Sequence, residues 1–171
     1  MHQIPGPYFR TPQSGGSPRC VRHIEIYNHD ADSNTYNDNE QMRLADVEVS
    51  QSGGPINLAG ATVKQGDKTD QLSEAVNGQA TNAIDGIVAT ESLTDISNIQ
   101  RGGVWWKLDL GGEYDVQQIK ITAPSTNGAH LEGAFVYARD SNYQILWSTR
   151  ITGASDGSIH DLTVETCCTP P

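Results

Sequence analysis

One short run of residues constrains the fold of this chain more than any other. Residues 105–110 read Trp-Trp-Lys-Leu-Asp-Leu, so that Trp106, Leu108 and Leu110 alternate with a lysine and an aspartate. An apolar residue at every second position is typical of a strand with one buried face. Two glycines follow directly, which indicates that the strand ends in a turn. The sequence therefore predicts a β-rich fold whose core contains this strand.

A second segment, residues 82–86, reads Asn-Ala-Ile-Asp-Gly and predicts a tight polar corner. A carboxylate placed before a glycine, such as that of Asp85, either caps a turn or binds a hard cation. Both interpretations of Asp85 remain open at the level of the residues.

Length and charge restrict the remaining possibilities. The 171 residues favour a single domain, and the net charge of -10 argues against nucleic acid and anionic membrane surfaces as partners. Calcium or a neutral glycan suits such a chain better. No apolar run reaches the length of a membrane span, and residues 1–17 have neither a basic start nor an apolar segment. We therefore expect no membrane insertion and no signal peptide.

The first fifty residues divide into a tail and a pair of strands. Residues 1–19 are rich in Pro, Gly and Ser, which predicts an extended tail or linker. Within residues 20–50, apolar residues alternate over residues 21–27 and 42–50, so we expect two strands that could pair with each other. An acidic, Asn-rich loop lies between them.

The Ala-Ile-Asp-Gly corner followed by the Trp-Trp-x-Leu-Asp-Leu-Gly strand resembles the discoidin family, which comprises the coagulation-factor-type C domains and their fucose-binding lectin relatives. The resemblance covers most of residues 57–166. It implies an all-β fold, an antiparallel jelly-roll or discoidin-like β-sandwich. Residues 167–171, which follow it, read as a Cys/Pro tail. The segments that carry it, in the family's order, are residues 57–59, 83–86, 105–111, 116–121 and 131–137.

The two closing strands of the family find their match at the N-terminal end of this chain instead. In the family they read approximately Arg-aromatic-hydrophobic-x-hydrophobic and Leu-x-Glu-Val-Glu-Val, which residues 22–26 and 44–49 resemble. The order therefore resembles a circular permutation. Either these strands complete their own sandwich, or they fill the gap in a neighbouring copy and build a head-to-tail filament. The side chains that would be donated are Arg22, Ile24, Ile26, Leu44, Val47 and Val49.

The three cysteines lie on either side of this permutation. Cys20 precedes the displaced strands, whereas Cys167 and Cys168 follow the last ordinary strand, so both arrangements bring Cys20 near the pair. In an oxidising compartment an odd cysteine suggests a bond between copies, and the alternative is three reduced thiols. The pattern favours an extracellular or cell-surface chain whose copies are linked.

The resemblance also implies a structural calcium ion. In lectin members the ion is held by the Asp of the Asp-Gly corner, by backbone carbonyls, by a nearby hydroxyl and by the first Glu of a closing strand. Here Asp46 replaces that Glu, and Ile87 replaces the usual Asn. The alternative is that Asp85 caps a turn and Asp46 is a solvated strand residue. The matching positions are Asp85, Asp46, the carbonyls of Asn82, Ile87 and Ala45, and the hydroxyl of Thr90 or Ser92.

Glycan binding is the default activity of the family, but its fucose site does not carry over. That site uses a His and two Arg around a vicinal cysteine pair, and residues 123–131 contain no Arg and no Cys. Trp105, Asn127 and His130 could form a different sugar surface, or they could be ordinary core and surface residues.

Two further patterns bear on function. Residues 153–157 read Gly-Ala-Ser-Asp-Gly, the spacing of a nucleophile elbow, but a strand pattern follows in place of a helix, so we expect a turn and no enzyme. Thr11, Ser17 and Thr169 stand next to prolines in the termini, a composition of O-glycosylated stalks and of plain linkers alike.

These patterns favour a non-enzymatic extracellular structural subunit that assembles head to tail through strand complementation and cysteine cross-links. The alternative is a calcium-dependent carbohydrate-binding module, such as part of a lectin or adhesin.

Overall fold

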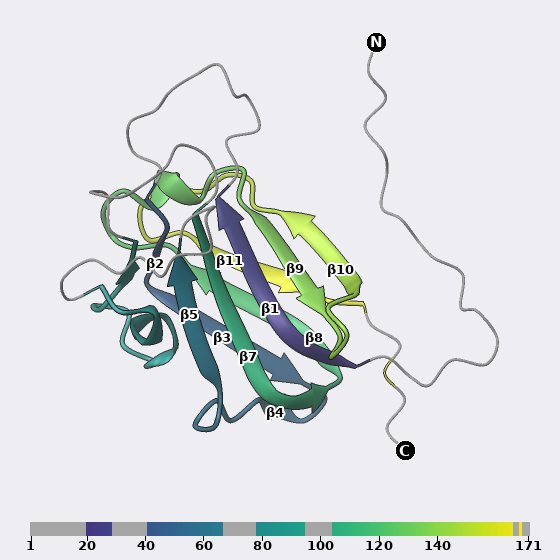
Figure 1. Ribbon diagram of the computed structural model, residues 1–171. Coiled ribbons are helices and arrows are strands. Elements are labelled where there is room, and N and C mark those ends of the chain that lie inside the picture. The colour runs from purple at the N-terminus through teal and green to yellow at the C-terminus, as the bar shows by residue number, and fades with distance from the viewer. Residues whose placement is uncertain (1–19, 29–40, 67–77, 95–103, 166–167, 169–171) are drawn as a thin grey trace, which may run out of the picture.

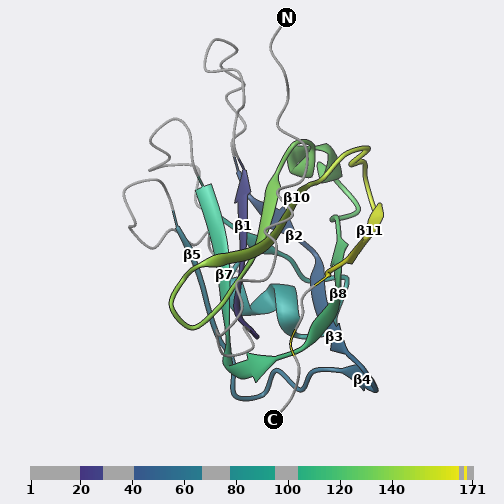
Figure 2. The ribbon, with the colours of Figure 1, turned by 90° about the vertical axis from the view of Figure 1, so that its right-hand side faces the viewer.

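The computed structural model describes residues 20–28, 41–66, 78–94, 104–165 and 168. Their strands pair in an antiparallel manner and form two sheets that face each other across a shared apolar core (Figures 1 and 2). The predicted all-β sandwich is confirmed at this level. The expected tail at residues 1–19 lies outside the described residues, as does most of the expected tail at 167–171.

The larger sheet contains the strand with the Trp-Trp-Lys-Leu-Asp-Leu sequence. Its order is β10 (Ile145–Arg150), β9 (Phe135–Arg139), β1 (Val21–Asn28), β7 (Val104–Tyr114) and β5 (Thr62–Gly66). On β7 the side chains of Trp106, Leu108 and Leu110 are buried in the core, as the alternation predicts. The indole Nε1 of Trp106 donates to the carbonyl of Ala80 at 3.0 Å, which satisfies the one polar group of this buried ring.

The smaller sheet forms the opposite layer (Figure 2). Its order is β11 (Ile159–Thr163), β8 (Val116–Thr122), β3 (Asp46–Gln51) and β4 (Gly54–Pro55). A two-stranded ladder pairs β2 (Arg43–Leu44) with β6 (Ser92–Leu93), and two 3-10 helices, η1 (Ala80–Ile84) and η3 (Gly128–Leu131), lie in the connections. Among the described residues, no helix is long and apolar enough to cross a membrane.

The two N-terminal strands do not pair with each other, so that prediction is wrong. β1 lies between β7 and β9 in one sheet, whereas β3 lies between β8 and β4 in the other. Each strand buries one apolar face, and facing layers let both faces enter the same core. Ile24 and Ile26 of β1 and Val47 and Val49 of β3 are accordingly almost fully buried.

Candidate functional site

The position of β1 between β7 and β9 is fixed by polar contacts as well as by its apolar face. Glu25 points away from the core but is only 3% exposed, and Arg139 Nε on β9 donates to its Oε2 at 2.6 Å. Arg22 Nε donates to Asp109 Oδ1 on β7 at 3.1 Å, and this partner lowers the pKa of Asp109. Since a change of register would separate both pairs, they specify how β1 pairs with its neighbours.

A disulfide joins Cys20, directly before β1, to Cys168, after β11. It is one of the pairings that the sequence leaves open. The two cysteines are 148 residues apart in the chain, so the bond connects the start of the N-terminal strands to the far end of the sandwich. Cys167 lies outside the described residues, as do Thr11, Ser17 and Thr169.

The N-terminal strands are joined to the rest of the sandwich by a short turn. Residues 20–51 carry β1, β2 and β3, and the main chain leaves this segment through Ser52 and Gly53 into β4. Gly53 and Gly54 have φ values of 103° and 129°, which residues other than glycine rarely adopt. We call residues 20–51 the N-terminal module and residues 52–54 its hinge.

Asp85 forms the polar corner that the sequence predicts. Its Oδ1 accepts a hydrogen bond from Ile87 N and its Oδ2 accepts one from the Thr90 hydroxyl, both at 2.7 Å. The Thr90 hydroxyl oxygen also lies 2.8 Å from the carbonyl oxygen of Ile87. A carboxylate, a hydroxyl and a carbonyl therefore gather at this corner, and Gly86, with φ of 73°, makes the turn.

Asp46 is a buried carboxyl on the outer face of β3, with 5% of its surface exposed. Its pKa is raised, first because burial disfavours the charged form, and then because the carboxylates of Glu48 and Asp85 lie nearby. The hydrogen bond between the Asp46 and Glu48 carboxyl groups raises it further. Lys120, which pairs with Glu48, offsets part of this effect.

These residues carry oxygen atoms of the kind that calcium prefers. Two carboxylates, a hydroxyl and a carbonyl supply oxygen ligands, and Ser92 Oγ is buried without a hydrogen-bond partner. Ser92 pairs with Leu44, two residues before Asp46. Within the described ranges, no group of three or more His, Cys, Asp or Glu side chains could hold a metal ion, so the ion would depend on neutral oxygens.

The backbone N–H groups of two other expected ligand residues are hydrogen-bonded. Ala45 N donates to the carbonyl of Thr122 at 3.0 Å, and Asn82 N donates to the carbonyl of Gln79 at the same distance. The amide side chain of Asn82 donates to the carbonyl of Glu91, which holds η1 against the segment leading to β6.

A polar cluster lies where η3 meets β2. Arg43 Nη1 donates to Glu91 Oε1 at 3.1 Å, while His130 Nδ1 is buried without a hydrogen-bond partner. Burial lowers the pKa of His130, and the charge of Arg43 lowers it further, whereas Asp156 and Glu91 act in the opposite direction. Asn127 precedes His130 on the same turn, with φ of 60°.

Trp105 lies on the outer face of the larger sheet and is only 5% exposed. Lys107 Nζ lies 4.2 Å from the centroid of its ring. Trp105 therefore presents little of its ring to solvent. The Gly-Ala-Ser-Asp-Gly segment forms the expected turn, in which Asp156 Oδ1 accepts a hydrogen bond from Gly128 N at 2.7 Å.

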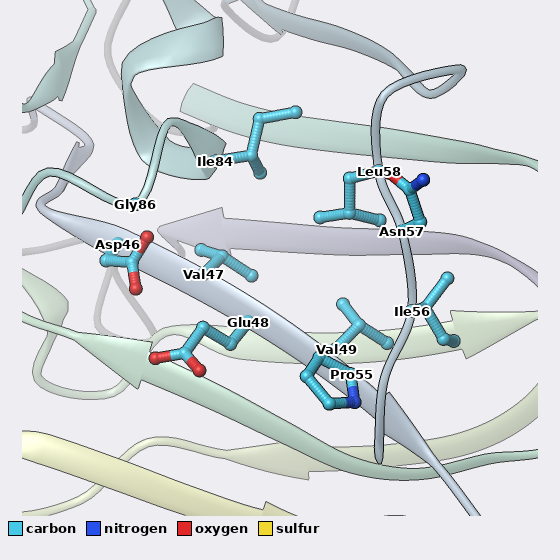
Figure 3. Close-up of a pocket in the computed structure, with 10 residues that line it drawn as sticks. All are labelled: Asp46, Val47, Glu48, Val49, Pro55, Ile56, Asn57, Leu58, Ile84 and Gly86. Carbon is cyan, nitrogen blue, oxygen red and sulfur yellow. The ribbon is translucent and has the colours of Figure 1, made fainter. Parts of the chain in front are cut away.

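A groove of about 240 Å³ runs beside β3 (Figure 3). Carboxyl groups stand at one end, and apolar side chains together with the amide of Asn57 line the remainder. The sequence does not reveal this groove, because its walls come from separate segments. The lining residues are Asp46, Val47, Glu48, Val49, Pro55, Ile56, Asn57, Leu58, Ile84 and Gly86.

Comparisons with protein-family models, with curated proteins and with solved structures find no match to this chain.

Proposed function

We propose that this chain is a non-enzymatic structural subunit, located outside the cell or at its surface, whose copies join head to tail by exchanging their N-terminal modules. The proposal extends to a permuted, discoidin-like jelly roll, in which the displaced closing strands are the exchanged element.

The way in which the N-terminal module is connected to the sandwich supports this proposal. The N-terminal module contributes one inner strand to the larger sheet and one to the smaller sheet, yet its main chain joins the rest of the sandwich only through the hinge. If the hinge extends, the module of one copy can make every one of these contacts in a neighbouring copy. Closed and exchanged forms then differ mainly in the conformation of the hinge.

Exchange of the module would turn the disulfide into a covalent bond between two copies. Cys20 belongs to the module and Cys168 belongs to the body of the sandwich. Whenever a module moves to a neighbour, the same bond connects two copies. Disulfides persist in oxidising compartments, which supports a location outside the cell.

The direction of assembly follows from the symmetry of the contact. The donated module and the accepting sheets are different surfaces, so each copy can donate at one end and accept at the other. Such a contact is heterologous and propagates as a filament unless the rotation between copies closes a ring.

The first test is the mass of the native material, with and without reductant and with calcium or chelator. We expect multiples of the 18.5 kDa unit that persist in denaturant and fall to one unit only after reduction. A monomer under every condition would contradict the proposal.

Calcium is proposed as a stabiliser of the assembly. The residues that would hold it are Asp85, Asp46, the Thr90 or Ser92 hydroxyl, and the carbonyls of Asn82, Ile87 and Ala45. A bound ion would neutralise the carboxylates and connect β3 of the module to the corner of the body. Since it would bind only the completed sandwich, it would stabilise that state by mass action.

A second candidate function is calcium-dependent carbohydrate binding, and the polar cluster at η3 favours it. Sugar hydroxyls need donors and acceptors, and Arg43, Glu91 and His130 supply such groups, although the atoms without a partner (Arg43 Nε, Glu91 Oε2 and His130 Nδ1) are buried. Binding of a glycan panel by the native protein that is lost in His130→Ala would support this candidate. Equal binding by both proteins, or by neither, would reject it.

A further inference from the structure

We infer that the groove beside β3 binds the N-terminal segment of a second copy, residues 8–11, as an additional short strand of the smaller sheet. This inference rests on the proposed self-assembly, and it adds a contact that is distinct from the exchanged module.

The groove exposes an unpaired edge of β3. β4 pairs only with Ser50 and Gln51, and the last bond on this side runs from Ile56 N to the carbonyl of Val49 at 2.8 Å. Because backbone groups point to alternate sides along a strand, the N–H and C=O of Val47 point the same way as that carbonyl. No described segment pairs with β3 between Asp46 and Glu48 on this side. Unpaired edges of this kind accept an added strand.

The side chains of the groove set the chemistry of the added strand. Ile56, Leu58 and Ile84 line the inner side, so an apolar side chain fits there (Figure 3). Asp46 and Glu48 lie on the outer face of β3, where Glu48 already pairs with Lys120 and a second basic side chain can reach the carboxyl groups. Because side chains of a strand alternate between faces, the occupant needs an apolar residue directly next to a basic one.

The N-terminal segment carries this pattern. All 21 acidic residues of the chain follow Cys20, so residues 1–19 contain two arginines and no carboxylate side chain. Residues 8–11 read Tyr-Phe-Arg-Thr, between Pro7 and Pro12. Aromatic residues and threonine favour strands, and the flanking prolines limit pairing to these four residues.

The alternation then assigns each side chain a place. Phe9 points inward against Leu58 and Ile84, and Arg10 points outward beside Asp46 and Glu48. Thr11 lies nine positions before Cys20, a reach of about 30 Å when extended, which is enough to pass from one sandwich to the next.

The test uses a fluorescent peptide of residues 6–13, titrated in chelator into the full chain carrying Phe9→Ala and Arg10→Glu, whose own segment no longer competes. We expect saturable binding that weakens at least tenfold when the peptide carries either substitution. Leu58→Glu in the groove should have the same effect. Ile159→Glu, which alters a 59% exposed side chain at the opposite edge of the same sheet, should leave binding unchanged.

The outcomes separate this inference from the proposed function. Binding that ignores Leu58→Glu, or no binding at all, would overturn the groove assignment even if the chain assembles. Wild-type chain that remains monomeric and excludes the peptide would show that each segment occupies its own groove, which overturns the role of the second copy. Wild-type chain that is monomeric yet binds the peptide would support the groove and reject the self-assembly on which the role of a second copy depends.

Discussion

At the scale of single residues, the buried carboxyl of Asp46 makes the stability of the sandwich depend on pH. Its pKa is raised chiefly by burial, so the folded chain holds its proton more tightly than the unfolded chain does. The contribution of this residue to stability is therefore present below the ordinary pKa of 3.8 and is lost as the pH rises through the higher pKa of the folded state.

Asp46→Asn should consequently have opposite effects in chelator and in calcium. In chelator at neutral pH we expect an unchanged or higher melting temperature, because the variant no longer buries a charge. In millimolar calcium we expect the variant to lose the rise in melting temperature that wild type shows. Thermal unfolding under the two conditions measures both effects, and wild-type unfolding that ignores calcium would contradict the proposed site.

The ion pair of Glu25 and Arg139 is the second residue-scale test. Arg139→Gln leaves a nearly buried carboxylate without its cation, which should cost about 2–4 kcal/mol of unfolding free energy. Lys64→Gln on the same sheet removes an equal charge from an exposed side chain and should change stability by less than about 0.5 kcal/mol. Urea denaturation of both variants measures these losses of unfolding free energy. Equal losses would show that the ion pair does not stabilise β1 in the sheet.

At the scale of elements, the hinge decides between closed and exchanged forms. Short hinges favour exchange, and longer ones let a module fold back onto its own chain. Insertion of Gly-Ser-Gly-Ser between Ser52 and Gly53 should therefore raise the monomer fraction measured by light scattering after reduction and refolding. The same insertion between Ser141 and Asn142, in the turn from β9 to β10, should not. An equal change of the monomer fraction with both insertions would contradict the role of the hinge in exchange.

Elements with local signals were predictable, and those that depend on distant partners were not. The alternation on β7 and the Asp-Gly corner at 85–86 are properties of adjacent residues, and both are present in the structure. The pairing of β1 with β3 was predicted wrongly, because alternation gives the buried face of a strand but not its neighbours. Glu25 and Arg139 lie 114 residues apart, so no local pattern could reveal their contact.

The same limit applies to the candidate sites. Asp85 and Thr90 lie five residues apart, and their contact belongs to one turn. The groove beside β3, by contrast, combines residues from β3, the segment after β4, and η1. Its charged end and apolar floor become visible only once these segments are placed together.

At the scale of the whole molecule, the disulfide connects both ends of the described fold. On the chain-entropy account, a bond that closes a loop of this length stabilises the folded chain by roughly 5 kcal/mol. Cys20→Ser should therefore lower the urea midpoint and also abolish multimers that survive denaturant. Loss of stability with unchanged covalent multimers would assign the cross-link to Cys167 and Cys168 instead.

In the proposed assembly, the bond between Cys20 and Cys168 connects neighbouring copies. The most direct measurement mixes isotopically heavy and light chains under reducing, denaturing conditions, refolds them in calcium, blocks free thiols and identifies disulfide-linked peptides by mass spectrometry. Exchange predicts heavy Cys20 peptides bonded to light Cys168 peptides at nearly the statistical proportion. Only heavy–heavy and light–light pairs would show that every module folds onto its own chain, and would contradict assembly by strand exchange.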